Sequence, residues 1–141
     1  MTSKRPRAIL VAAIAAALAL PLSAAPAKRA ATIADLYAIQ GVGEPVIAPD
    51  GKSLAFTVTS TDLPAVKRWT NLWRVDADGK NARALTVLDK RDASPAFSPD
   101  GATLAFLSTR SGAPQVWFLP MAGGEPEKKT DVPGGVGAFR F

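Results

Sequence analysis

Two pairs of closely spaced aspartates are the residues whose types and spacing could do chemistry in this sequence. Asp76 with Asp78, and Asp89 with Asp92, bring carboxylates together as an acid–base pair or a calcium loop would. The first pair falls in an expected hairpin turn and the second in an expected loop, where aspartates commonly bond the local backbone. A calcium loop also needs more oxygen ligands in a tight run. We therefore interpret both pairs as turn chemistry.

The composition removes the commonest catalytic groups. None of the 141 residues is Cys or His, which excludes disulfides, thiolate nucleophiles and imidazole bases or metal ligands. The sequence also lacks a Gly-x-Ser-x-Gly nucleophile motif and a phosphate-binding glycine-rich loop before a helix. We accordingly predict no catalytic, cofactor-binding or metal-ligating residue and no cofactor, and we expect this chain to be inactive alone.

The first 27 residues are predicted to form a secretory signal peptide. Lys4, Arg5 and Arg7 precede an apolar run at residues 8–20, and the small residues up to Ala27 offer a cleavage site. The run of 13 residues is shorter than the roughly 20 that span a bilayer, so no stable membrane anchor is expected. No Cys follows it for lipid attachment. The expected location is the periplasm or the cell exterior.

The formal charge of +5 comes largely from this leader, because it holds three of the 17 basic residues. The remaining basic residues do not cluster as nucleic-acid-binding proteins require, so no nucleic acid partner is expected. The pairs Lys67-Arg68 and Lys90-Arg91 are isolated, and we interpret them as solvated loop charges rather than a binding stripe.

One phrase occurs twice and predicts a structural repeat. The segments Pro45–Phe56 and Pro95–Phe106 share seven of twelve residues. The segments 71–86 and 115–130 are also similar, though more weakly, and their matched residues Trp73 and Trp117 are 44 positions apart. The longer first copy has six extra residues between its Phe and its Trp. We expect these to form a loop, with Ser60–Thr70 either lining a propeller mouth or lying as a plain surface loop.

Each unit is predicted to form four short antiparallel strands. A Pro-Asp-Gly turn joins the first two strands, because Pro presets φ, Asp bonds the backbone and Gly accepts positive φ. Leu54 and Phe56 alternate with Ala55 and Thr57, so large side chains of one unit can nest against small ones of the next. The strands are expected at residues 46–48, 53–59, 72–75 and 82–86, and then at 96–97, 103–108, 115–119 and 128–130.

Four strands in about 44 residues is the size of one β-propeller blade. A β-sandwich is the competing fold, but its strands would not echo one another in sequence. Trp73 and Trp117 are expected to be packing anchors. Before the repeats, Thr32 and Asp35 form a capping box that predicts a helix over Ile33–Ile39.

The predicted fold class is therefore all-β, a partial propeller preceded by a signal peptide and one short helix. Residues 28–44 hold the helix and the lead-in, and residues 45–141 hold an incomplete propeller. Within it, blade one spans 45–86, blade two spans 95–130, and 136–141 begin a third blade.

The stretch from Leu36 to Phe56, with the full Ser98-Pro99-Asp100-Gly101 phrase, resembles the opening of secreted bacterial prolyl oligopeptidase-family enzymes. These include dipeptidyl aminopeptidases and acylaminoacyl peptidases with TolB-like repeats. Leu85-Thr86 and Gly123-Gly124 also match the repeat pattern, whereas Ala48 replaces the first Ser and Lys129 replaces a Leu.

The resemblance implies an N-terminal propeller fragment of an exported serine peptidase that hydrolyses short peptides. Its partners would be the missing C-terminal α/β-hydrolase domain, which carries the catalytic triad, and a peptide substrate. Two alternatives stay open at this point. One is a TolB-like periplasmic propeller that acts as a protein-interaction module, and the other is an exported amidohydrolase with the same propeller in front.

Overall fold

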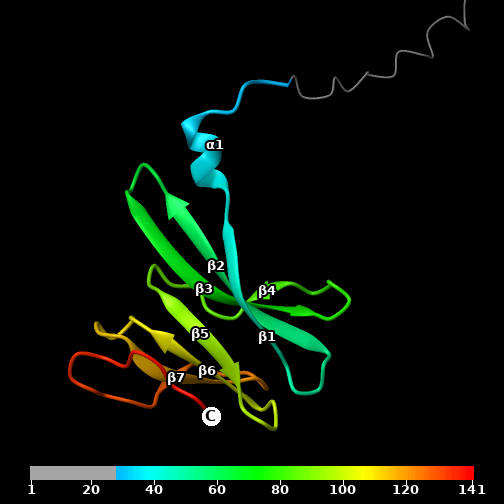
Figure 1. Ribbon diagram of the computed structural model, residues 1–141, viewed down its shortest axis with the longest axis vertical. Helices are drawn as coiled ribbons and strands as arrows, with labels where there is room; N and C mark the ends of the chain where they lie inside the picture. Colours follow the sequence, from blue (N-terminus) through cyan, green and yellow to red (C-terminus); the bar gives the residue numbers. More distant parts are fainter. Residues whose placement is uncertain (1–27) are drawn as a thin grey trace, which may run out of the picture. The chain divides into compact units, whose positions relative to one another are not determined.

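Two four-stranded antiparallel sheets, each built from consecutive strands, form the main part of the chain (Figure 1). The computed structural model describes residues 28–141, so the predicted signal peptide lies outside the described residues. We call β1–β4 blade one and β5–β8 blade two. The elements are α1 (Ile33–Ala38), β1 (Gly41–Ile47), β2 (Ser53–Asp62), β3 (Lys67–Asp76), β4 (Arg83–Ala84), β5 (Asp92–Phe97), β6 (Thr103–Ser108), β7 (Gln115–Pro120) and β8 (Glu127–Lys128).

This strand order confirms the predicted all-β, partial-propeller fold class. The two repeated hairpins belong to separate sheets, as the blade interpretation requires and a shared sheet would not allow. The Pro-Asp-Gly turns work as expected, since Gly51 and Gly101 adopt φ of 69° and 71°. In each turn the aspartate side chain accepts a hydrogen bond from the amide two residues later, at 2.9 Å for Asp50 and 3.0 Å for Asp100.

The first strand of each blade is longer than predicted. Each one contains a β-bulge, and the prediction covered only residues that follow the bulge. In blade one this strand is predicted at residues 46–48 and spans Gly41–Ile47 in the structure. In blade two it is predicted at residues 96–97 and spans Asp92–Phe97. Their pairing shifts register between Gly43 and Val46 and at the same place in blade two. Glu44 and Ser94 occupy equivalent positions in these bulges and adopt φ of 49° and 53°. The proline that follows each one lacks an amide donor, which suits a bulge but hides the strand from its sequence.

The six extra residues of blade one lengthen a hairpin and do not form the predicted loop. Strands β2 and β3 pair continuously from Ser53 with Asp76 to Asp62 with Lys67, and the hairpin extends beyond the rest of its sheet (Figure 1). The turn at residues 63–66 is closed by Asp62, whose carboxylate accepts the Ala65 amide at 3.0 Å. An insertion of even length keeps the inward and outward alternation of both strands, so the sheet absorbs it.

The fourth strands are only two residues long, and side chains complete the edge of each blade. The Thr86 hydroxyl accepts the Leu72 amide at 2.9 Å, and Thr130 accepts the Val116 amide at the same distance. This contact explains why a Thr recurs at the end of each repeat. The fourth strands predicted at 82–86 and 128–130 are shorter in the structure, at Arg83–Ala84 and Glu127–Lys128, and these side-chain bonds follow them.

The core lies between the blades. Ala55 and Leu72 of blade one pack against Leu104, Phe106 and Leu119 of blade two in a single buried cluster. The small-residue face of β2 therefore meets the large-residue face of β6, as the alternation predicted. Trp117 packs against this cluster from its edge, which confirms its predicted anchoring role.

The other face of blade two is covered by residues 132–141. The Val136 amide donates to the Pro114 carbonyl at 2.7 Å, and the Phe141 ring lies 5.6 Å from the Phe118 ring. A Cβ added to Gly135 would come within 2.8 Å of Pro114, so this approach needs a glycine. Residues 136–141 form no strand in the described structure, and their assignment to a third blade stays a prediction.

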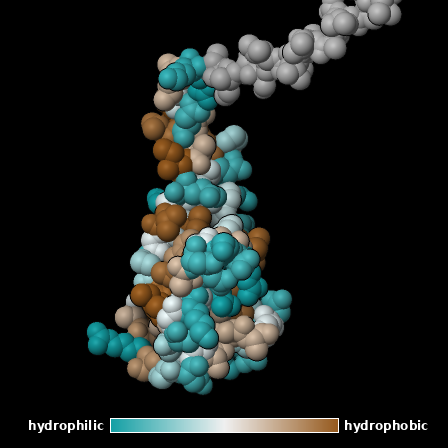
Figure 2. Space-filling view, turned by 90° about the vertical axis from the view of Figure 1, so that its right-hand side faces the viewer, coloured by the Kyte–Doolittle hydropathy of each residue, from teal (hydrophilic) through white to brown (hydrophobic). Residues whose placement is uncertain are grey.

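Helix α1 forms with the predicted capping box but buries none of its residues. The Thr32 amide donates to the Asp35 carboxylate at 2.6 Å, and the Asp35 amide donates to the Thr32 hydroxyl at 3.4 Å. The helix ends at Ala38, one residue before its predicted end. Its apolar side chains are exposed, with Leu36 at 64% and Ile33 at 71%, and hydrophobic surface is visible around the helix in Figure 2.

Candidate functional site

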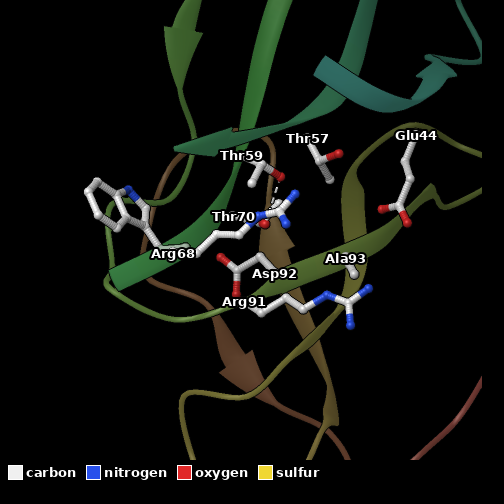
Figure 3. Close-up of a pocket in the computed structure, with 9 residues that line it drawn as sticks. Glu44, Thr57, Thr59, Arg68, Thr70, Arg91, Asp92 and Ala93 are labelled. Carbon is white, nitrogen blue, oxygen red and sulfur yellow. Dashed lines mark hydrogen bonds between the residues drawn. The ribbon is translucent and has the colours of Figure 1, made fainter. Parts of the chain in front are cut away.

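A groove of about 420 Å³ lies between the two blades, and it is the candidate site (Figure 3). It forms where the early residues of β1 and β5 meet the extended part of the β2–β3 hairpin. Blade one contributes most of the groove, and the start of blade two completes it. The lining residues are Glu44, Thr57, Thr59, Arg68, Trp69, Thr70, Arg91, Asp92 and Ala93.

Threonine hydroxyls from two neighbouring strands form one wall. Thr59 of β2 and Thr70 of β3 are cross-strand partners, and their hydroxyl oxygens are 2.9 Å apart. The Thr70 amide donates to the Lys90 carbonyl at 3.0 Å, which ties this wall to the segment that connects the blades. The groove therefore has a polar wall on a paired sheet, whose backbone is held in place by the ladder.

Two arginines reach the groove from backbone that is fixed by pairing. Arg68 pairs with Thr61 in the extended hairpin, and its side chain runs toward Thr59 and Thr70 (Figure 3). Arg91 donates its amide to the Thr109 hydroxyl at 3.2 Å and accepts the Thr109 amide at 3.1 Å. Within residues 28–141, neither guanidinium forms a salt bridge.

The two carboxylates of the groove already have partners. Glu44 accepts the Ser94 amide at 2.7 Å, a bond that links the equivalent bulges of the two blades. Asp92 is 1% exposed at its side chain and receives Arg110 through both oxygens, at 3.1 and 3.3 Å. Arg110 also donates to Ser108 at 2.9 Å. Its guanidinium lies 5.2 Å from the Phe106 ring centre and 4.8 Å from that of Trp117.

The aspartates that the sequence paired each bond to other residues in the structure. Asp78 accepts the Lys80 amide at 2.9 Å and Asp76 accepts Asn81 at 2.7 Å, which confirms turn chemistry for the first pair. The Lys80 backbone and side-chain bonds lower the pKa of Asp78 below its ordinary value. In the second pair, Asp92 lies in a strand, so its predicted loop position is wrong.

The two basic pairs are solvent-exposed as predicted, but Lys67-Arg68 lies in a strand, and sequence reasoning missed that the arginines of both pairs meet at one groove. Arg68 lies in a strand and Arg91 immediately precedes one, and the fold brings both to the same groove. They are separated by more than twenty residues, so no local pattern predicted their meeting. The one available signal was the polar, β-branched character of the insertion, which favours a strand over a loop.

The described residues offer no grouping suited to a metal ion: within 28–141 no three carboxylates converge. Nor does that part of the chain contain a helix that is long and apolar enough to cross a membrane. The groove presents guanidinium, hydroxyl and carboxylate groups, which can bind a ligand through charge and hydrogen bonds.

Fold and repeats together define a β-propeller, and comparison with known families specifies which kind. The model of the TolB β-propeller domain matches residues 27–134. The chain belongs to this family.

Peptidases are among the proteins that the chain is similar to. It is 36% identical over 110 residues to the uncharacterized peptidase YuxL of Bacillus subtilis (strain 168). That alignment covers 77% of this chain but only 17% of the relative. The predicted resemblance to peptidase propellers with TolB-like repeats is thereby confirmed.

Solved structures give the same fold. The acylaminoacyl peptidase of Pyrococcus horikoshii matches with a TM-score of 0.57 at 15% identity, over 70% of this chain and 15% of that one. An acylaminoacyl peptidase in complex with Z-Gly-Gly-Phe-chloromethyl ketone matches with a TM-score of 0.56 at 16% identity, over 67% and 14% of the two chains. The chain thus spans a small part of the length of these proteins.

Proposed function

We propose that this chain is the first part of the propeller of an exported serine peptidase that hydrolyses short peptides. In this proposal the propeller filters and positions substrate, and a C-terminal α/β-hydrolase domain outside these 141 residues performs the chemistry. The main support is the 36% identity to a peptidase of which the chain covers 17%. The basic leader with its apolar run supports export to the periplasm or beyond.

The division of labour follows from the residues present. Acyl transfer by a serine hydrolase needs a nucleophile, a histidine base and an acid that orients it. This chain has no histidine, so the proposal assigns it no catalytic step. What it supplies is a wall of paired strands with a polar groove at one end, suited to contact a peptide before the bond reaches the nucleophile.

A second candidate is a TolB-like propeller that binds envelope proteins and carries no chemistry. The description of the matching family, a TolB β-propeller domain, favours it. An exported amidohydrolase with the same propeller in front is the third candidate, and no observation on the described residues favours it.

Two measurements separate these candidates. The first reads the coding sequence beyond Phe141. A Gly-x-Ser-x-Gly motif followed by Asp and His supports the peptidase, whereas further blades and a stop codon support the binding module. A cluster of metal-binding histidines would indicate the amidohydrolase.

The second measurement treats the complete protein with a fluorophosphonate probe and assays it on short peptide anilides. The peptidase proposal expects labelling of one serine and release of the anilide. The 141-residue chain serves as the control and should be neither labelled nor active. A complete protein that carries the motif but hydrolyses no peptide would contradict the proposal.

A further inference from the structure

The groove between the blades carries an unbalanced positive charge. Its lining holds two arginines and two carboxylates, but one of the carboxylates, Asp92, is neutralised by Arg110 from outside the groove. Glu44 is therefore the one carboxylate of the lining that no arginine neutralises within residues 28–141. Both guanidinium groups lack a salt-bridge partner among residues 28–141, so each keeps donors free for a ligand.

We propose that this groove binds the carboxylate of a peptide, with Arg68 and Arg91 as its cationic ligands. A guanidinium presents a planar fork of N–H donors that matches the two oxygens of a carboxylate. The hydroxyls of Thr59 and Thr70, which already bond each other at 2.9 Å, lie on the wall toward which Arg68 points (Figure 3). They add neutral hydrogen-bonding groups beside the charge.

The charge balance selects a monoanion over a phosphate. Two guanidinium groups against one carboxylate leave about one unit of positive charge, which a single carboxylate neutralises. A phosphate near −2 would place excess negative charge beside Glu44 and the buried Asp92, and like charges at short range are repelled. Glu44 in turn can accept an amide N–H, a donor that the terminal residue of a peptide carries and acetate does not.

The peptide part of this inference rests on the proposed function, whereas the carboxylate site rests on the groove alone. Its position also suits recognition. Arg68 stands on an extended hairpin, and the Arg91 backbone bonds the hydroxyl and the amide of Thr109, so both arginines project from backbone that is held in place. Backbone that is fixed before binding adds no further loss of conformational entropy when the ligand binds.

Trp69 provides a nearby reporter, because it stands between the groove residues Arg68 and Thr70 in β3, whereas the other two tryptophans do not line the groove. The full chain is labelled with 5-fluorotryptophan, and the Trp69 signal is assigned by Trp69→Phe. Trialanine with a free carboxyl end is then titrated and followed by ¹⁹F NMR. We expect a saturable shift confined to the Trp69 signal. Trialanine amide should bind about tenfold more weakly, because one charge-assisted hydrogen-bond pair is lost.

Matched variants test the two arginines. Arg68→Gln and Arg91→Gln should each weaken binding of trialanine about tenfold, while Arg83→Gln, an exposed arginine outside the groove, should leave it unchanged. Arg68→Lys keeps the charge without the fork and should fall between. If the three fluorine signals of Arg68→Gln collapse together, that variant has unfolded, and Arg68→Lys then tests the role of Arg68 in its place.

Several results would overturn the inference. They are an amide that binds as tightly as the acid, unchanged affinity in both Gln variants, or phosphate that binds more tightly than trialanine. If acetate binds as tightly as trialanine, the carboxylate site stands, but the claim that the site recognises a peptide is wrong. None of these readouts depends on hydrolysis, so failure of the peptidase proposal in its own assay is a separate outcome.

Discussion

Blade one and blade two contain the same repeated phrase, but they are stabilised differently. In blade two the central strand is buried along most of its length, because blade one covers one face and residues 132–141 cover the other. In blade one, Leu54 and Phe56 point to the face away from blade two and are only half-buried.

The polar contacts follow the same division. Blade two has the buried Asp92–Arg110 pair and the Ser98 bonds, where blade one has Val42, Ser60 and Ala48 at the equivalent positions. The comparison teaches that the repeat specifies the backbone of a blade, while the side chains at its ends depend on how fully that blade is enclosed.

Truncating the matched phenylalanines should give the largest difference between the blades. Phe106 is fully buried in the cluster between the sheets, so Phe106→Ala should lower the free energy of unfolding by about 4 kcal/mol. Phe56→Ala removes a half-buried ring and should lower it by about 2 kcal/mol. Urea unfolding of the full chain, followed by tryptophan fluorescence, measures both. Equal losses would mean that the two faces are equally enclosed.

The buried ion pair should come next. Arg110→Gln leaves the carboxylate of Asp92 buried without its cation and should cost about 3 kcal/mol in the same assay. The double change Asp92→Val with Arg110→Ser installs the residues of blade one and should recover most of that loss. If the double variant is as unstable as Arg110→Gln, the ion pair contributes packing or specificity beyond the mutual neutralisation of its charges. The Val and Ser of blade one would then not be able to replace it in blade two.

The threonines that end the repeats should give a smaller contrast. Thr86→Val leaves the Leu72 amide without an acceptor at a buried position and should cost about 2 kcal/mol. Thr130→Val removes the equivalent bond and a second one to Gln115, but Thr130 is half-exposed, so water can replace part of the loss and the cost should be about 1 kcal/mol. Amide hydrogen exchange at Leu72 and Val116 reports each bond directly. Faster exchange at both amides with no loss of stability would contradict this assignment.

The Ser and Ala of the two Pro-Asp-Gly turns should give the smallest effect. Ser98 accepts the Thr103 amide at 3.0 Å, so Ser98→Ala should destabilise the chain by about 1 kcal/mol. Ala48→Ser offers blade one the same bond and should stabilise it by about 0.5 kcal/mol. Thermal unfolding of the two variants side by side measures these shifts, and a destabilising Ala48→Ser would mean that the first turn has no room for the hydroxyl.

The same serine also controls a titration. Its hydroxyl donates to Asp100 at 2.6 Å and, with the Ala102 amide, holds the pKa of Asp100 below its ordinary value of 3.8. Because the folded-state pKa is lowered, this contribution to stability is complete above pH 3.8 and is lost as the pH falls through the folded pKa. In Ser98→Ala the pKa of Asp100 should rise, which carboxyl ¹³C NMR detects.

Local sequence was enough to predict the two blades. The repeated Pro-Asp-Gly phrase, the alternation of Leu54, Ala55 and Phe56, and the Thr32–Asp35 cap each act within a few residues. Turn geometry and side-chain alternation depend on such short separations, so the sequence alone determined the Pro-Asp-Gly hairpins, the helix and which faces would pack. The bulges at Glu44 and Ser94 escaped it because proline and small residues there interrupt the pattern of a strand.

The tertiary structure decided the candidate site. Arg68 reaches the groove only because six extra residues extend a hairpin, and Arg91 reaches it only because the chain between the blades crosses back to Thr70. Asp92 is buried because Arg110, 18 positions later, folds over it. These meetings join residues that are distant in the chain, and their energies depend on burial and on the position of a neighbouring charge. Neither quantity exists until the two sheets pack, so no reading of local pattern could supply them.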